Sequence, residues 1–193
     1  GNLSGFLIPV LFFLIITAFI PFDRVFEYEV DEGLYLMRAY LHMKGYALYK
    51  EVWMEQPPVL VLLLSCLFKL FGPSVQAARF LMLAFSSLLL WSVYQIVSKT
   101  RNAAAALCAV VLIAFSARYV RLSVAVMGPV PAIALSALAM YGIVLYQENY
   151  RKRYLLLSGG LFALAVLTRF FALIFLCASL IGIFMAGRAK TSA

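Results

Sequence analysis

Long apolar blocks separated by short polar segments dominate this chain. A helix of about 17–25 residues crosses a hydrocarbon layer about 30 Å thick, and the longer blocks fall in that range. The pattern therefore predicts an all-α integral membrane protein with about six transmembrane helices, all within one unit covering residues 1–193. We expect the spans at residues 6–22, 75–97, 103–117, 130–146, 154–168 and 170–187.

The segment between the first two spans, residues 23–74, is too polar to cross a membrane and predicts two juxtamembrane surface helices. Residues 31–44 place apolar side chains on one helical face, which indicates an amphipathic helix along the membrane surface. Residues 59–71 are apolar but would reach only about 20 Å as a helix, and they contain Lys69. We interpret this second stretch as an interfacial or re-entrant helix.

Basic residues between the spans set the expected orientation. Small basic groups at residues 99–101, 151–153 and 188–190 would all face the cytoplasm if residues 59–71 do not cross. The sequence thus predicts a multi-pass protein of a cell membrane, of the bacterial inner-membrane type, with loop 23–74 extracytoplasmic.

Composition and charge exclude two other classes. With 65% apolar and 12% charged residues, the chain is far more apolar than a soluble domain. The net charge of +8 is divided among these small groups, so no basic face for nucleic acid is expected.

Acidic residues concentrate in the first loop, where seven of the eight precede Pro57. Three explanations are open from the residues alone: a solvated acidic loop, a divalent-metal site, or a carboxylate acting as general base. The seven are Asp23, Glu27, Glu29, Asp31, Glu32, Glu51 and Glu55.

An ordered set of residues in this loop resembles a known family. The set is Asp31-Glu32, Tyr35, Ala39, Gly45, Tyr49, Trp53, Glu55, Pro57-Pro58, Phe71-Gly72 and Arg79. It is similar to the first extracytoplasmic loop of the GT-C glycosyltransferases, above all the protein O-mannosyltransferase-like proteins and the bacterial aminoarabinose transferases of lipid A. The stretch around Thr168-Arg169 also resembles that family.

The resemblance implies an inverting glycosyltransferase of the cell envelope. Its donor would be a sugar linked to polyprenyl phosphate in the bilayer, and its acceptor would lie on the extracytoplasmic side. Asp31 would be the catalytic base, with Glu32 beside it. Glu55 would belong to the site or, together with Asp31, hold a divalent metal ion as cofactor. Three arginines at the expected outer ends of spans are candidates to bind the donor phosphate: Arg79, Arg118 and Arg121.

Two departures from the family pattern leave an alternative open. Gly128 stands before Pro129 where the family often carries an acid. The resemblance also covers only the N-terminal portion of such enzymes, so the rest of the enzyme or a partner chain would be needed. A non-catalytic scaffold or lipid-carrier-binding subunit with the same fold is therefore the alternative, and a transporter is a weaker third interpretation.

Two further positions have simpler interpretations. Arg169 interrupts two apolar blocks, which favours a role in a turn over ligand contact. The Gly159-Gly160 pair is typical of close helix packing.

Overall fold

The computed structural model describes residues 3–22 and 25–191, with side chains left out at residues 3, 4, 6 and 185–191. Regular structure in these ranges is helical. The elements are α1 (Leu3–Phe19), α2 (Glu32–Met43), α3 (Val59–Phe71), α4 (Val75–Thr100), α5 (Ala103–Ala114), α6 (Ala117–Val124), α7 (Pro129–Asn149), α8 (Lys152–Val166), the 3-10 turn η1 (Phe170–Ala172) and α9 (Leu173–Thr191).

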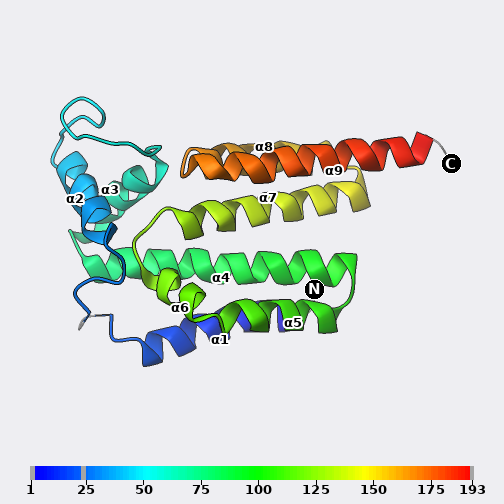
Figure 1. Cartoon of the computed structure of the whole chain (residues 1–193), viewed down its shortest axis with the longest axis horizontal. Coiled ribbons are helices and arrows are strands. Elements are labelled where there is room, and N and C mark those ends of the chain that lie inside the picture. Colours follow the sequence, from blue (N-terminus) through cyan, green and yellow to red (C-terminus); the bar gives the residue numbers. More distant parts are fainter. Residues whose placement is uncertain (1–2, 23–24, 192–193) are drawn as a thin grey trace.

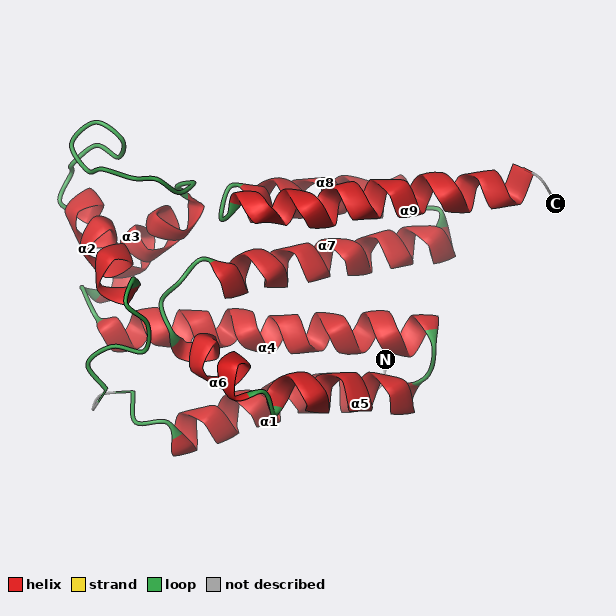
Figure 2. Cartoon of the chain, viewed as in Figure 1, coloured by secondary structure: helices red, strands yellow, loops and turns green. Residues whose placement is uncertain are grey.

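The longer helices form a bundle in which successive members alternate in direction. Helices α1, α4, α5, α7, α8 and α9 run along the long axis, and α2, α3 and α6 gather at one end (Figure 1). The central helix is α4, which packs against α1 and α5 on one side and α7 on the other, while α8 packs against α7. Figure 2 shows that the longest irregular segments also lie at the end that carries α2 and α3.

Two helices are long and apolar enough to cross a membrane by themselves. These are α4, with 26 residues, and α7, with 21, which correspond to about 39 Å and about 32 Å of helix. Helices α5 and α6 pass the same test only as a pair, bent by 73° at the break between them. Among the described side chains, residues 7–19, 59–71 and 170–184 form shorter apolar helices. The described part of the chain is thus all-α, and its helices give two or three spans by length and composition.

The bend between α5 and α6 corrects the span expected at residues 103–117. The helix ends at Ala114, and Ser116 begins a new one by accepting a hydrogen bond from the backbone N–H of Tyr119 at 3.5 Å. A serine hydroxyl is a favoured N-cap, so it starts α6 where an uninterrupted span was predicted.

Both surface helices occur where the sequence predicts them. Helix α3 has the predicted bounds, and its last residue is followed by Gly72 at φ 81°, a conformation that favours glycine. Helices α2 and α3 pack against each other through a buried cluster that includes Tyr35, Leu60, Leu64 and Phe68. This pair forms a cap over one end of the bundle.

The close approach between α7 and α8 occurs at Gly142, and not at the predicted glycine pair. A Cβ at Gly142 would collide with the Ser158 hydroxyl oxygen, whereas a Cβ at Gly159 or Gly160 would meet nothing within 4 Å. The expectation of helix packing at Gly159-Gly160 is therefore wrong. Both glycines are exposed on the outer side of α8.

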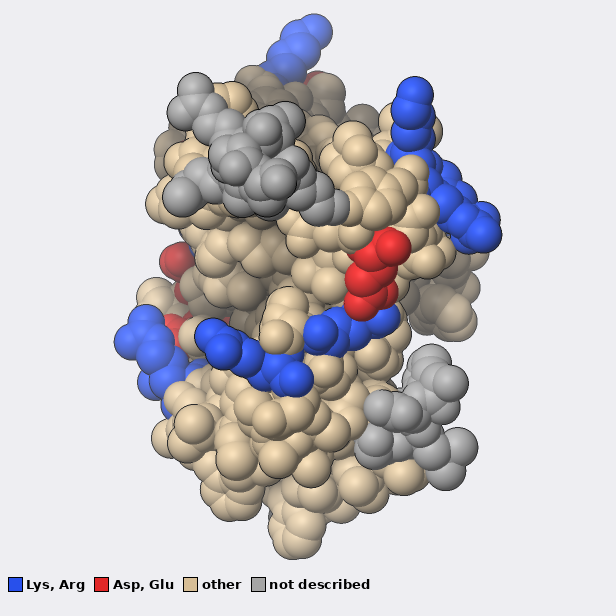
Figure 3. Space-filling view, turned by 90° about the vertical axis from the view of Figure 1, so that its right-hand side faces the viewer, with Lys and Arg blue, Asp and Glu red and all other residues tan. Residues whose placement is uncertain are grey.

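The opposite end of the bundle carries basic side chains. Lys99, Arg101 and residues 151–153 lie where α4 ends and α8 begins, and Figure 3 shows this end with its Lys and Arg side chains spread over the surface. Lys99 forms an ion pair with Glu148 at 2.7 Å. The acidic loop and these basic groups thus occupy opposite ends, as the sequence predicts.

Candidate functional site

A buried ion pair fixes the beginning of α2 to the beginning of α4. Arg79 donates from Nε to one oxygen of Glu32 at 2.9 Å and from Nη2 to the other at 3.0 Å. Both residues are only 1% exposed. Glu32 also accepts hydrogen bonds from the backbone N–H groups of Tyr28 and Val126. Its carboxylate therefore joins four segments of the chain.

Arg79 has no donor left for a ligand. Besides the two bonds to Glu32, it donates to the carbonyl oxygens of Phe22 at 2.5 Å, Val25 at 2.9 Å and Phe26 at 3.2 Å. A guanidinium has five N–H groups, and all five have acceptors within the protein. The predicted binding of a donor phosphate by Arg79, and the predicted catalytic role of Glu32, would each require this network to break. In this structure both residues hold segments of the chain together, and their predicted roles in catalysis and phosphate binding stay predictions.

Asp31 occupies the N-cap position of α2, directly before the buried Glu32. Its side chain is exposed and makes no capping hydrogen bond, so the carboxylate stays accessible at the surface of the cap. One turn further along, Tyr35 is buried, and burial raises the pKa of its hydroxyl. The negative charges of Asp31 and Glu55 add to this rise in the pKa of Tyr35.

Glu55 is held by a two-pronged contact with Arg38 of α2. The guanidinium donates to one carboxylate oxygen at 3.1 Å and to the other at 2.6 Å. Arg38 is buried and lies 5.4 Å from the centre of the Trp53 ring. The hydrogen bonds from Arg38 are the main cause that lowers the pKa of Glu55. Glu55 is therefore an ionised, oriented carboxylate at neutral pH.

The segment that carries Glu55 is tied to the distant turn after α8. The backbone N–H of Val59 donates to the carbonyl oxygen of Leu167 at 3.1 Å. The same turn continues with Thr168 and Arg169 before η1 begins. This contact brings Glu55 and Arg169 to one place although the sequence separates them widely.

From the sequence, Arg169 was expected to have a role in a turn and not to contact a ligand. Its positive charge acts to lower the pKa of both Tyr35 and Glu55. Its Nε is buried without a hydrogen-bond partner. A Cβ at Gly128 would lie 2.8 Å from this Nε and 2.9 Å from Cγ of the same side chain.

Gly128 thus leaves the space that Arg169 fills. The family resemblance around Thr168-Arg169 was a signal for this residue, but no periodicity or spacing in the sequence pairs it with Gly128. The position where an acid was expected is therefore covered by a cation.

The two remaining candidate arginines lie one turn apart on α6. Arg121 forms an ion pair with Glu29 at 3.1 Å and donates to the carbonyl oxygen of Tyr28 at 2.8 Å, which places it beside the segment that leads to Asp31. Arg118 is exposed. Both are accessible, and their predicted contact with a donor phosphate stays a prediction.

The donor set does not fit a metal ion as the side chains stand. Across residues 3–22 and 25–191 no three His, Cys, Asp or Glu side chains come close enough to hold one. Both oxygens of Glu55 contact Arg38, and a metal at Asp31 and Glu55 would have to compete with that guanidinium.

Comparison with known proteins decides the family. The model of the dolichyl-phosphate-mannose-protein mannosyltransferases matches residues 55–192, which is more than half of the chain. The chain belongs to this family. This family is part of the GT-C superfamily. Its members are membrane-bound glycosyltransferases that use sugars linked to polyprenyl phosphates. No curated protein and no solved structure matches the chain.

The matched region of this mannosyltransferase-family chain begins at Glu55 and includes Gly128 and Arg169. Asp31 and Glu32 lie before it. The predicted base thus depends on the ordered residues of the loop, not on the family match.

Proposed function

We propose that this chain forms part of an inverting glycosyltransferase that moves a sugar from a polyprenyl phosphate to an acceptor hydroxyl on the extracytoplasmic side. The observation that carries the proposal lies at the capped end of the bundle, where the bond from the N–H of Val59 to the carbonyl oxygen of Leu167 brings the Glu55 segment to the turn with Arg169. Asp31 begins α2, the helix whose Arg38 holds Glu55. One accessible carboxylate, one fixed carboxylate and one cation with an unused donor are the groups that such a transfer needs.

The proposed reaction proceeds in one displacement. The acceptor oxygen attacks the anomeric carbon from the face opposite the lipid phosphate, and its proton passes to the carboxylate of Asp31. The bond between the anomeric carbon and the phosphate oxygen breaks, and its electron pair leaves with the polyprenyl phosphate. Because the leaving group is already an anion, it needs a cation nearby more than a protonating acid.

Arg169 is the cation that we assign to the donor phosphate. Its Nε has no hydrogen-bond partner among the described residues, and Gly128 leaves room for its side chain. Glu55, held by Arg38, orients this region and is the proposed positioning residue for Arg169 or for the sugar hydroxyls. Arg118 and Arg121 are the competing candidates for the phosphate.

Replacing Arg169 with glutamine should weaken binding of a polyprenyl-phosphate sugar about tenfold or more, since a charge-assisted hydrogen bond is lost. The measurement is a titration of the purified full-length protein with the donor in detergent. Arg118→Gln is the matched control, because it removes the same charge from an exposed position of the same end. If Arg118→Gln weakened donor binding more than Arg169→Gln did, the phosphate site would have to be assigned to α6 and not to Arg169.

We also propose six membrane crossings, with both chain ends and the basic end of the bundle in the cytoplasm. Helices α1, α4, α5, α7, α8 and α9 alternate in direction (Figure 1), and Lys and Arg side chains spread over the end where α4 ends and α8 begins (Figure 3). The short helices would cross in a locally thinned bilayer.

Single cysteines introduced in place of Lys50 and Arg101 test this orientation. After Cys66, Cys108 and Cys177 are changed to serine, an impermeant maleimide added to intact cells should label the cysteine at position 50. The cysteine at position 101 should react only after the membrane is opened. The reverse pattern, or labelling of both from outside, would contradict the proposed orientation.

One observation favours a second candidate function, a subunit that binds the lipid carrier without catalysis. Gly128 stands where the resemblance to the family leads us to expect an acid, and the Arg169 side chain lies against this glycine. This candidate predicts donor binding that depends on Arg169 together with no sugar transfer, whatever residue stands at position 31. The transfer assay on the Asp31 variant, described below, separates the two.

A further inference from the structure

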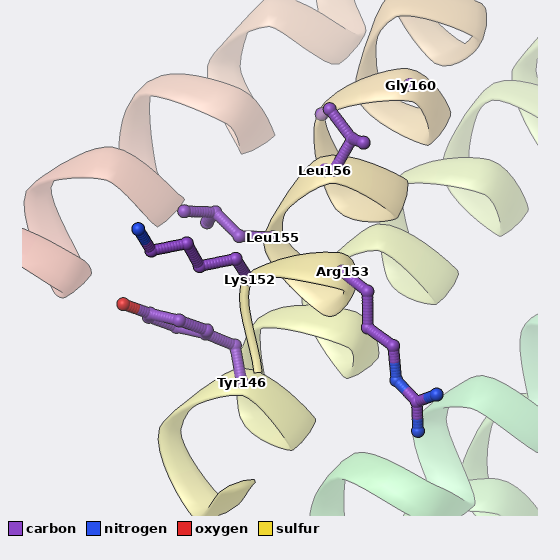
Figure 4. A pocket seen from close by; sticks show the side chains of 7 residues that line it. Tyr146, Lys152, Arg153, Leu155, Leu156 and Gly160 are labelled. Atoms are coloured by element: carbon purple, nitrogen blue, oxygen red, sulfur yellow. The ribbon is translucent and has the colours of Figure 1, made fainter. Parts of the chain in front are cut away.

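An open groove lies at the basic end of the bundle, far from the proposed reaction site. Its volume is about 620 Å³. It is lined by Tyr146 near the end of α7 and by residues of the first two turns and a half of α8: Lys152, Arg153, Leu155, Leu156, Gly159 and Gly160. Figure 4 shows the groove from close by.

The mouth of the groove is polar and positively charged. In Figure 4 the ammonium of Lys152 and the hydroxyl of Tyr146 extend in the same direction, while Arg153 leaves the helix on another side. Among the described side chains, no ion pair engages Lys152. The nearby acid, Glu148, is paired with Lys99. Two hydrogen-bond donors, one of them charged, therefore face an open space at this mouth.

The rest of the groove is apolar. Leu155 and Leu156 are exposed, with Leu156 80% accessible. A Cβ at Gly159 or Gly160 would meet nothing within 4 Å, so the glycines make the floor hollow. From Lys152 to Gly160 the groove follows α8 for about 12 Å at 1.5 Å per residue. A charged mouth that leads into an apolar channel along a helix matches a molecule with an anionic head and a hydrocarbon tail.

We propose that this groove binds an anionic phospholipid. Its phosphate would accept from Lys152 and Tyr146, and one acyl chain would lie along Leu155, Leu156 and the two glycines. The cytoplasmic leaflet, which this end faces in the orientation proposed above, is the leaflet that carries anionic lipids. The proposal uses that orientation but neither the donor nor the reaction.

Retention of lipid by the purified full-length protein tests the proposal. The protein in mild detergent is incubated with phosphatidylglycerol or phosphatidylcholine of identical chains, and bound lipid is counted by native mass spectrometry. Phosphatidylglycerol should be retained in preference, and Lys152→Gln should lower its retention about fivefold, the contribution of one cation near an anionic headgroup. Gly159→Leu and Gly160→Leu should lower it as well, because they fill the floor and leave the charge unchanged.

Arg101→Gln is the matched control, since Arg101 is exposed at the same end but outside the groove. An equal loss for Arg101→Gln and Lys152→Gln would show a diffuse charge effect and overturn the site. Equal retention of the two lipids would also overturn it. The site would likewise be overturned if the protein retained polyprenyl phosphate in a Lys152-dependent way and did not retain phosphatidylglycerol. Because no sugar transfer enters the assay, its failure leaves the proposed enzyme untouched, and failure of the enzyme leaves this site untouched.

Discussion

Replacing Asp31 with asparagine in the full-length protein should lower sugar transfer about a hundredfold or more, while binding of the donor changes little. The substitution keeps the shape of the side chain and removes only its capacity to accept the acceptor's proton. Asp31 makes no capping hydrogen bond in α2 and is exposed, so the fold should not depend on its charge. The measurement is release of polyprenyl phosphate from the donor, beside a binding titration of the same preparation.

Glu27→Gln supplies the control for this result. Glu27 is an exposed acid of the same loop, so its loss changes the loop charge equally without touching the proposed base. Similar turnover in Asp31→Asn and the unmodified protein would remove Asp31 from the mechanism. If the protein binds the donor but transfers no sugar, with aspartate or with asparagine at position 31, the result would support the alternative function as a lipid-carrier-binding subunit.

The second large effect is expected on stability. Arg79→Met should lower the free energy of unfolding by about 3–5 kcal/mol, because it leaves the Glu32 carboxylate buried without its partner. It also removes the donors to three backbone carbonyls. Thermal unfolding in detergent measures the loss. The double variant Glu32→Leu with Arg79→Met should be less destabilised than the sum of the single ones, since no buried charge is left unpaired.

Lys99→Met is a matched comparison on the same helix. Lys99 pairs with Glu148, but the two side chains are 30% and 41% exposed, and such pairs contribute at most about 1 kcal/mol. If Arg79→Met lowered the free energy of unfolding no more than Lys99→Met, the buried pair would not be the anchor of α2 that the two hydrogen bonds between Arg79 and Glu32 indicate.

The sequence predicts the helices well because their signals are local. Apolar length marks α4 and α7, and a short apolar stretch bounded by Pro58 and Gly72 marks α3 with its observed bounds. The break between α5 and α6 was missed because a single capping serine decides it. Apolar composition does not carry that information.

The site was predicted only in part because its pairings are between distant residues. Charge and sequence order singled out Asp31 and Glu55. Nothing in the order of residues shows that Glu32 takes up Arg79, or that Arg169 comes to lie on Gly128. Those contacts depend on how α2, α4 and the turn after α8 meet, which is set by the packing of the whole bundle.

The hydrogen bond from Val59 to Leu167 has a consequence for biosynthesis. At about 5–20 residues per second, the roughly 110 residues between its two ends take about 5 to 20 s to be made. During that time Glu55 has already been added to the nascent chain, while the turn with Arg169 does not yet exist. The acid and the cation of the site therefore meet only after the first five long helices have been synthesised, and no shorter nascent chain can hold both.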